Sequence, residues 1–515
     1  MTIEMQAFPV YYVFSSKGIQ EYILRGNKLR WMIGGSNLVE RLPVFFEELL
    51  SSLGFSKEED YKVLSRAAGG VRMLFRSREQ ALKVARVMPL ALSLYAPGLD
   101  FVQATLPIEV NLAKTMEAAE KKLQQRRNRV FPVFPVAGPL VERCPRSGLP
   151  SVGILSIDGD SELLDSSMKT KERAFRDAKK GLAEKTLPEK YSDLGLLFPS
   201  SFEEFQDEKK YVGVVHIDGN GLGKVIIEFL QKTMGDPDEK VAKYYTELSK
   251  AIENATVSSV KKALEPIIER TIDEKREVLP FRPLVCAGDD LTIVLRAEDA
   301  FSFAVTFLQE FENATEMELR KVGADAGSSF LTACAGIAYV KDNYPFVQAY
   351  SLCESLCSYA KDETQRKSSA LAFWRVTTTT ASEFKDIRER ELHYEDTTLT
   401  MMPYVTGKNA ASAGFPTTES LQCLLEAIKR MPRGSVRGLL ADLYESSDKA
   451  IRSLERLCDV AKQRGDEKRA QEFLECLRNV TQNGNAGPLK ADVLFTESNK
   501  KTPLLDAVEL RSVEC

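Results

Sequence analysis

Residues 284–295, Leu284-Val-Cys-Ala-Gly-Asp-Asp-Leu-Thr-Ile-Val-Leu295, decide the fold of this chain. Two apolar runs of β-prone residues flank a tight turn at Ala287-Gly288, and this pattern predicts a β-hairpin. Asp289 and Asp290 stand at the start of the second run, so the hairpin places two carboxylates at the rim of a sheet. Carboxylates in such a position can hold divalent metal ions against a triphosphate.

A second acidic strand end precedes the hairpin in the sequence. The apolar run 211–217 leads into Asp218-Gly-Asn-Gly-Leu-Gly-Lys224. A strand that ends in one Asp and enters a helix through glycines leaves backbone N–H groups free to bind phosphate. Together the two stretches predict a palm domain that polymerises or cyclises nucleotides.

The order of predicted elements occurs twice along the chain. The first copy reads as strand 9–15, helical stretch 17–53, hairpin 61–75, helix 78–92 and strand 101–107. The second copy reads as strand 211–217, a helical region from 222, hairpin 283–296, helix 298–313 and strand 330–340. Both copies follow the order β-α-β-β-α-β, the ferredoxin-like order from which palm domains are built.

The two copies differ where the chemistry is expected. The segment Ala67-Ala-Gly-Gly-Val71 falls on Ala287-Gly-Asp-Asp-Leu291, so glycines replace the carboxylates in the first copy. The first strand ends in Phe14-Ser-Ser16, with no acid that matches Asp218. We therefore expect an α+β protein with two ferredoxin-like palm domains, the first degenerate and the second active. The expected domains are a degenerate palm at 1–130, a connecting subdomain at 131–210, a catalytic palm at 211–400 and a C-terminal helical domain at 401–515.

Composition narrows the class of protein. The chain has 515 residues, 43% of them apolar and 28% charged, as in ordinary globular proteins, and its net charge of −4 draws it to no nucleic acid as a whole. Its two histidines are too few for a histidine-rich metallohydrolase. We expect no membrane partner and a cytoplasmic location, because no long apolar segment or signal peptide is present. The nine scattered cysteines fit reduced thiols.

Nucleotidyl transfer by two divalent ions explains why these acids stand where they do. Mg²⁺ or Mn²⁺ prefers oxygen ligands and keeps several waters, so two or three protein carboxylates suffice. We expect Asp218, Asp289 and Asp290 to be the catalytic and metal-binding residues, with the Ile217 carbonyl as an additional ligand. Because successive strand residues point to opposite faces, Asp218 and Asp289 are the favoured pair, with Asp290 close behind.

The residues around the acids are expected to bind the nucleotide. Gly219 and Gly221 allow close backbone approach, and the helix start at Leu222 offers free N–H groups. Lys224 and Lys361 are candidates for the phosphate tail, although a solvated surface position is an equally good interpretation of either lysine. The turn residue Gly288 completes this group.

The second copy resembles the large polymerase/cyclase subunit of type III CRISPR effector complexes, in a form without the HD nuclease domain. The resemblance rests on His216-Ile-Asp-Gly-Asn-Gly-Leu-Gly-Lys224, Ala287-Gly-Asp-Asp290, Ala335-Gly-Ile-Ala338 and Ala360-Lys361. In the first copy it rests on Gly18-Ile-Gln-Glu-Tyr-Ile23 and on the segment 28–36. The chain departs from the usual Gly-Gly-Asp-Asp motif at Ala287.

The resemblance implies a nucleotidyltransferase that makes cyclic oligoadenylates from ATP in antiviral defence, with Asn220 and Gly221 near the nucleotide. It implies crRNA, target RNA and other type III subunits as partners, or a homodimer if the protein works alone. Two alternatives stay open. The first alternative is a catalytically silent scaffold subunit of an RNA-guided complex. The second is a stand-alone GGDEF-like cyclic dinucleotide synthase.

Overall fold

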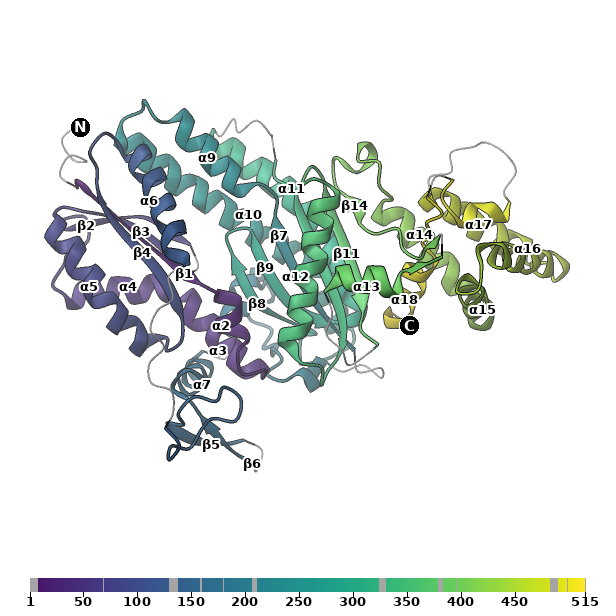
Figure 1. The fold of residues 1–515 in the computed structure, drawn as a ribbon, viewed down its shortest axis with the longest axis horizontal. Helices are drawn as coiled ribbons and strands as arrows, with labels where there is room; N and C mark the ends of the chain where they lie inside the picture. Colours follow the sequence, from purple (N-terminus) through teal and green to yellow (C-terminus); the bar gives the residue numbers. More distant parts are fainter. Residues whose placement is uncertain are drawn as a thin grey trace.

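The fold is described from a computed structural model of the chain (Figure 1). Figure 1 shows one sheet at the left, a second sheet in the middle and a group of helices near the C-terminus at the right. The structure describes residues 8–67, 69–128, 138–157, 160–178, 180–205, 211–323, 330–377, 383–395, 397–481, 490–497 and 499–514.

The first sheet is the ferredoxin-like unit expected from the first copy. Its four strands are antiparallel neighbours in the order β2-β3-β1-β4. The predicted helical stretch 17–53 is three helices, because Gly26 and Asn27 adopt positive φ after the first and Pro43 lies in the first turn of the third. The strands are β1 (Val10–Lys17), β2 (Tyr61–Ala67), β3 (Gly70–Phe75) and β4 (Asp100–Pro107), and the helices are α2 (Ile19–Leu24), α3 (Leu29–Glu40), α4 (Leu42–Ser52), α5 (Arg78–Tyr95) and α6 (Leu112–Arg127).

The second sheet repeats this unit and extends it. Its order is β14-β11-β10-β7-β9-β8, and the last four strands reproduce the arrangement of the first sheet. The added strands are β11, parallel to β10, and β14 from residues 404–406. The strands are β7 (Tyr211–Gly219), β8 (Phe281–Ala287), β9 (Asp290–Arg296), β10 (Ala333–Lys341), β11 (Ser369–Arg375) and β14 (Tyr404–Thr406), and the helices are α9 (Leu222–Lys232), α10 (Asp238–Asp273), α11 (Ala297–Val322) and α12 (Phe346–Glu363).

The segment between the sheets packs closely on the first palm at Gly34 of α3. A β-carbon at Gly34 would lie 2.6 Å from the carbonyl carbon of Lys171, so only glycine lets α3 approach α7 so closely. The buried Lys171 ammonium donates to the carbonyl oxygens of Tyr22 and Arg25. The elements of this segment are β5 (Gly153–Ile157), β6 (Asp160–Leu164), α7 (Ser166–Asp177) and α8 (Leu182–Thr186), followed by two short 3-10 helices at Glu189–Tyr191 and Phe202–Phe205.

The C-terminal part is largely helical, as predicted from its amphipathic pattern. Its last helix is locked to the second sheet by the buried Asp506 carboxylate, which accepts hydrogen bonds from the Met401 N–H (2.8 Å) and the Tyr404 hydroxyl (2.6 Å). The elements are α13 (Phe384–Glu391), β12 (His393–Tyr394), β13 (Thr397–Thr398), α14 (Thr418–Arg430), α15 (Arg433–Leu443), α16 (Ser447–Gln463), α17 (Glu467–Thr481) and α18 (Leu504–Glu514), with short 3-10 helices at Ala410–Ser412 and Ala491–Leu494.

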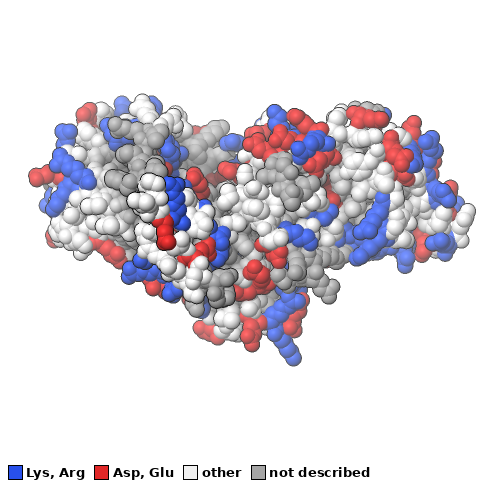
Figure 2. Space-filling view, turned by 60° about the horizontal axis from the view of Figure 1, so that its bottom comes forward, with Lys and Arg blue, Asp and Glu red and all other residues white. Residues whose placement is uncertain are grey.

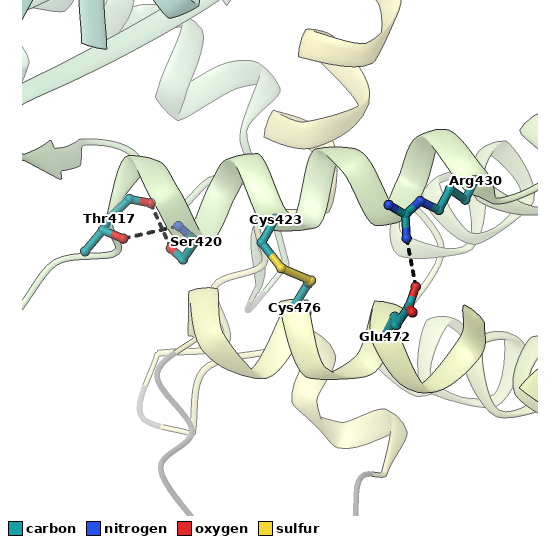
Figure 3. The surroundings of a disulfide bond; sticks show 6 residues. All are labelled: Thr417, Ser420, Cys423, Arg430, Glu472 and Cys476. Carbon is teal, nitrogen blue, oxygen red and sulfur yellow. Dashed lines mark hydrogen bonds and ion pairs between the residues drawn. A yellow bond between two sulfur atoms is a disulfide. The ribbon is translucent and has the colours of Figure 1, made fainter. Parts of the chain in front are cut away.

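A disulfide corrects the expectation that all cysteines are reduced. Cys423 of α14 and Cys476 of α17 are bonded, with their Cα atoms 5.7 Å apart (Figure 3). Next to this bond, Arg430 and Glu472 form an ion pair of 3.0 Å between the same two helices. The two cysteines are 53 residues apart, so no local spacing marks them as partners.

Two further expectations concern the surface. No helix within the described ranges is long and apolar enough to cross a membrane. Basic and acidic side chains are mixed over the face drawn in Figure 2, in keeping with the small net charge.

Candidate active site

The register of the second sheet brings the predicted acids together. β7 pairs antiparallel with β9, and the last pair of this ladder is Ile217 with Leu291. The next residue on each strand is an acid, so Asp218 and Asp290 leave the ladder at the same end. In the first sheet, Ser15 pairs with Gly70 at the matching position. The predicted contrast between the two copies is therefore present in the structure.

Asp289 lies in the hairpin turn rather than in the strand. Ala287 pairs with Asp290, so the two turn residues are Gly288 and Asp289, one position later than predicted. Gly288 has a φ of +65°, which favours glycine at the first position of a two-residue turn. Strand alternation therefore does not apply between Asp289 and Asp290, and the two side chains need not point to opposite faces.

Gly219 makes room for Asp289. A β-carbon at Gly219 would lie 2.7 Å from the Asp289 Cβ and would also overlap the Asp289 carboxylate. The Asp289 side chain therefore lies directly on the backbone that follows Asp218. All three acids meet where β7 ends.

Burial, and then the crowding of the acids, raises the pKa of two of them. Burial raises the pKa of Asp289 to about 6, with the Asp218 carboxylate adding to the effect. Burial raises the pKa of Asp290 to about 8, and the charges of Asp218 and Asp289 raise it further. The Lys361 ammonium opposes both shifts. The site therefore holds more negative charge than its own cation compensates.

Lys361 lies inside the site and is not a solvated surface charge. It stands in the last turn of α12 and is 6% exposed. Its Nζ lies 2.5 Å from Asp218 Oδ2 and donates to the Gly219 carbonyl oxygen at 3.1 Å. The ammonium thus holds Asp218 and the start of the glycine turn together.

Asp290 has two neighbours that sequence analysis assigned no role. Gln20 Nε2 donates to Asp290 Oδ2 at 2.9 Å. His216 Nδ1 lies 3.7 Å from Asp290 Oδ1 and 3.2 Å from the Thr292 hydroxyl. Burial lowers the pKa of His216 to about 4, so its ring is neutral at pH 7. Asp290 Oδ1 is buried and, among the residues that the structure describes, none donates a hydrogen bond to it.

The remaining predicted residues occupy different positions around the glycine turn. Asn220 is buried; its N–H donates to the Thr332 carbonyl at 2.7 Å and its Nδ2 to the Thr332 hydroxyl at 3.0 Å. Gly221, with a φ of +82°, precedes α9 and has open space around it. Leu222, the first residue of α9, is half-buried.

Three more predicted residues belong to the frame of the site. Ile217 is fully buried within the ladder between β9 and β10. The Gly288 carbonyl accepts a hydrogen bond from Thr256 of α10 at 2.6 Å, which ties the hairpin turn to that helix. Lys224 belongs to α9, and its side chain lies outside the described part of the structure.

The three carboxylates are suitable ligands for a divalent cation, although their present arrangement does not surround one. Across the described ranges, no three Asp, Glu, His or Cys side chains form a group arranged to hold a metal ion. The Asp218 carboxylate is instead paired with the Lys361 ammonium. However, Asp290 Oδ1 is a buried oxygen that accepts no hydrogen bond from the described residues, and burial together with the nearby Asp218 carboxylate raises the pKa of Asp289 and of Asp290. A cation that prefers oxygen ligands would bind the unpartnered oxygen and would favour the charged form of the carboxylates.

Comparisons with known proteins agree with this reading of the fold. Residues 211–370 match the family model of the second palm domain of Cas10/Cmr2. The predicted resemblance is therefore confirmed for this segment, which forms a palm domain within an α+β fold.

Two solved structures share this fold at low identity. The Csm1-Csm4 cassette in complex with cA4 gives a TM-score of 0.52 at 15% identity, covering 92% of this chain and 70% of that one. Csm1 in T. onnurineus gives a TM-score of 0.50 at 14% identity, covering 99% of this chain and 69% of that one. No curated protein matches the chain by sequence.

Proposed function

We propose that the chain is a nucleotidyltransferase that makes cyclic oligoadenylate-type second messengers from ATP, using Mg²⁺ or Mn²⁺. The observation that carries the proposal is the meeting of Asp218, Asp289 and Asp290 at one end of β7 and β9. These acids lie in the segment that matches the second palm of Cas10/Cmr2. The similar Csm1-Csm4 cassette is in complex with cA4, which supports the product class.

The three carboxylates would hold the divalent ions. Such ions, when bound, lower the pKa of an attacking hydroxyl and neutralise the charge on a leaving pyrophosphate. Lys361 would neutralise Asp218 until a cation takes that place, and its ammonium could then reach a phosphate oxygen. The N-terminus of α9, open at Gly221, presents backbone N–H groups to anionic oxygens.

The proposed setting is antiviral defence of the type III CRISPR kind. The partners would be crRNA, target RNA and other effector subunits. The likeness to a Csm1-Csm4 cassette supports other effector subunits as partners. If the protein works alone, a homodimer is the alternative assembly. In either setting the cytoplasm is the proposed location.

The test is synthesis by the purified full chain. The protein is incubated with Mg²⁺ or Mn²⁺ and each nucleoside triphosphate in turn, and the products are identified by liquid chromatography and mass spectrometry. We expect cyclic oligonucleotides from ATP, either from the chain alone or after addition of guide RNA, target RNA and partner subunits. An Asp289→Asn variant with unchanged circular dichroism should make none.

Other outcomes separate the alternatives. Cyclic dinucleotides made from GTP by the chain alone would favour a GGDEF-like synthase. Absence of any product, even with RNA and partner subunits, would leave a scaffold subunit and overturn the proposal. Synthesis by Asp289→Asn would overturn the assignment of the site.

A further inference from the structure

Helix α2 of the first palm reaches into the acidic site of the second palm. Its residue Gln20 donates an amide hydrogen to Asp290 Oδ2 over 2.9 Å, across 270 positions of sequence. Gln20 is half-buried, whereas its neighbour Glu21 points away and its side chain is 76% exposed. The contact therefore depends on which side of α2 faces the second palm.

The first palm holds α2 firmly in this position. Gly18, with a φ of +61°, turns the chain from β1 into α2. A β-carbon at Gly69 would overlap the Ile19 side chain, so α2 begins directly against the hairpin turn of its own palm. The Ser16 N–H donates to the Gly69 carbonyl at 2.6 Å and fixes that turn to β1. Gln20 is thus carried by a helix that packs directly against the hairpin turn of the first palm.

The same segment also holds the helix that presents Lys361. Asn27 Oδ1 accepts a hydrogen bond of 2.6 Å from the N–H of Phe346, the first residue of α12. Lys361 lies in the last turn of α12 and contacts Asp218. Residues 18–27 therefore contact the second palm at two elements of its site, at Asp290 of β9 and at the start of α12.

A neutral amide suits Asp290 for a physical reason. Gln20 donates one hydrogen bond without adding positive charge, so it can orient the carboxylate without repelling a metal ion. On the other side of the carboxylate, His216 Nδ1 lies 3.7 Å from Asp290 Oδ1. With Oδ2 held by Gln20, Oδ1 is the oxygen to which no described residue donates a hydrogen bond.

We infer that Gln20 is a positioning residue: it fixes the carboxylate of Asp290 so that its unbonded oxygen is available to a divalent cation. The inference rests on the proposed function, since it assumes that the acids bind metal. It also gives the first palm a direct part in the site of the second, although the first palm has no acids of its own at the matching positions. Residues 18–27 of the first palm would then form part of the active site of the second palm, in addition to packing against it.

The experiment measures metal binding without turnover. Mn²⁺ is titrated into the metal-free full chain, and free Mn²⁺ is followed by electron paramagnetic resonance. Gln20→Ala removes the donor, and Gln20→Leu removes it while keeping most of the side-chain volume. Glu21→Ala is the matched control, because it lies on the same helix but outside the site. Melting temperatures of the metal-free proteins show whether each variant is folded.

We expect both Gln20 variants to bind Mn²⁺ about tenfold more weakly, the usual effect of losing a partner that orients a metal ligand. Glu21→Ala should bind like the wild type. In synthesis assays, the Mn²⁺ concentration for half-maximal rate should rise in the Gln20 variants while the KM for ATP stays unchanged. A merely structural role would not separate these two quantities.

The contrary outcomes are distinct. Equal Mn²⁺ affinity in wild type and in a folded Gln20 variant would overturn the positioning role and leave the proposed function intact. A wild-type chain that binds no Mn²⁺ would overturn the proposed function, and the inference with it. If Gln20→Ala unfolds, the result with Gln20→Leu decides.

Discussion

The ammonium of Lys361 lies 2.5 Å from the carboxylate of Asp218, so one of the predicted metal ligands is already paired with a cation of the chain itself. Lys361 is buried, whereas the Asp218 side chain is 44% exposed. The lysine can therefore hold its place while the carboxylate stays accessible from solvent. A metal ion that binds Asp218 has to share it with Lys361 or displace it.

Replacing Lys361 by Met keeps most of the volume and removes the charge. We expect Lys361→Met to bind Mn²⁺ more tightly in the absence of nucleotide, because the three carboxylates then lose their internal counter-charge. Without metal, the variant should lose about 1–3 kcal/mol of unfolding free energy, less than a fully buried pair would cost because Asp218 is partly exposed. Urea unfolding with and without Mg²⁺, together with Mn²⁺ titration, measures both effects.

The control for this prediction is Lys367→Met. Lys367 is exposed, and its ammonium donates to Gln365 at 2.9 Å outside the site. The Lys367→Met variant should bind Mn²⁺ and unfold in urea like the wild type. Weaker Mn²⁺ binding in Lys361→Met would contradict the expectation and would mean that the lysine orients Asp218 for the metal instead of competing with it.

The stability of the metal-free protein should depend on pH through Asp289 and Asp290. Their folded pKa values are about 6 and about 8, above the ordinary value of 3.8, mainly because of burial and then because of Asp218. Between those limits the folded state binds more protons than the unfolded state, so the unfolding free energy falls as pH rises from about 4 to about 8. The charged or titratable groups around the pair are Asp218, His216 and Lys361.

Melting temperatures in EDTA across this pH range test the expectation. Asp290→Asn cannot ionise at that position, so its melting temperature should fall less between about pH 6 and pH 8 than that of the wild type. Over the same range Mn²⁺ should bind the wild type more tightly as pH rises, because metal and protons compete for the carboxylates. A wild type and a variant with parallel pH curves would disprove the assignment of these pKa values.

Gly219 should be the glycine of the turn that tolerates no side chain. Gly219→Ala places a β-carbon 2.7 Å from the Asp289 Cβ, so Asp289 has to move off the end of β7. We expect loss of Mn²⁺ binding and of synthesis, with an overpacking cost of about 1–3 kcal/mol in stability. Gly223→Ala, with open space at its β-carbon, is the matched control. It should keep both functions and gain slightly in stability, since alanine favours the helix.

Much of this fold could be predicted from local patterns. The alternating apolar runs and glycine turns predicted both β-α-β-β-α-β units, and the structure confirms them with the same strand order in each sheet. Asp218 and Asp290 also lie at strand ends as predicted, whereas Asp289 lies in the hairpin turn. Local patterns suffice here because hydrophobic period and turn chemistry act within a few residues.

The rest of the site depends on contacts that no local pattern encodes. A register shift in β8, between Pro283 and Val285, accompanies the placement of Asp289 in the turn. Gln20 meets Asp290 only because the two palms pack together. Lys361 could not be distinguished from a surface lysine, because its burial results from the approach of α12 to the end of β7. The motif Gly18-Ile-Gln20 was the sequence signal that could have pointed to the contact between Gln20 and Asp290.

The bond between Cys423 and Cys476 should stabilise the C-terminal helices, because it closes a loop over a separation of 53 residues and so restricts the unfolded chain. Reduction should lower the unfolding free energy of this part by about 2–4 kcal/mol. Thermal unfolding with and without dithiothreitol measures the effect. The double variant Cys423→Ser and Cys476→Ser should melt like the reduced wild type and should not respond to the reductant. Mn²⁺ binding at the palm should be unchanged in both, since α14 and α17 contribute no residue to that site. A wild type that melts identically in both conditions would show that these thiols are not bonded in solution.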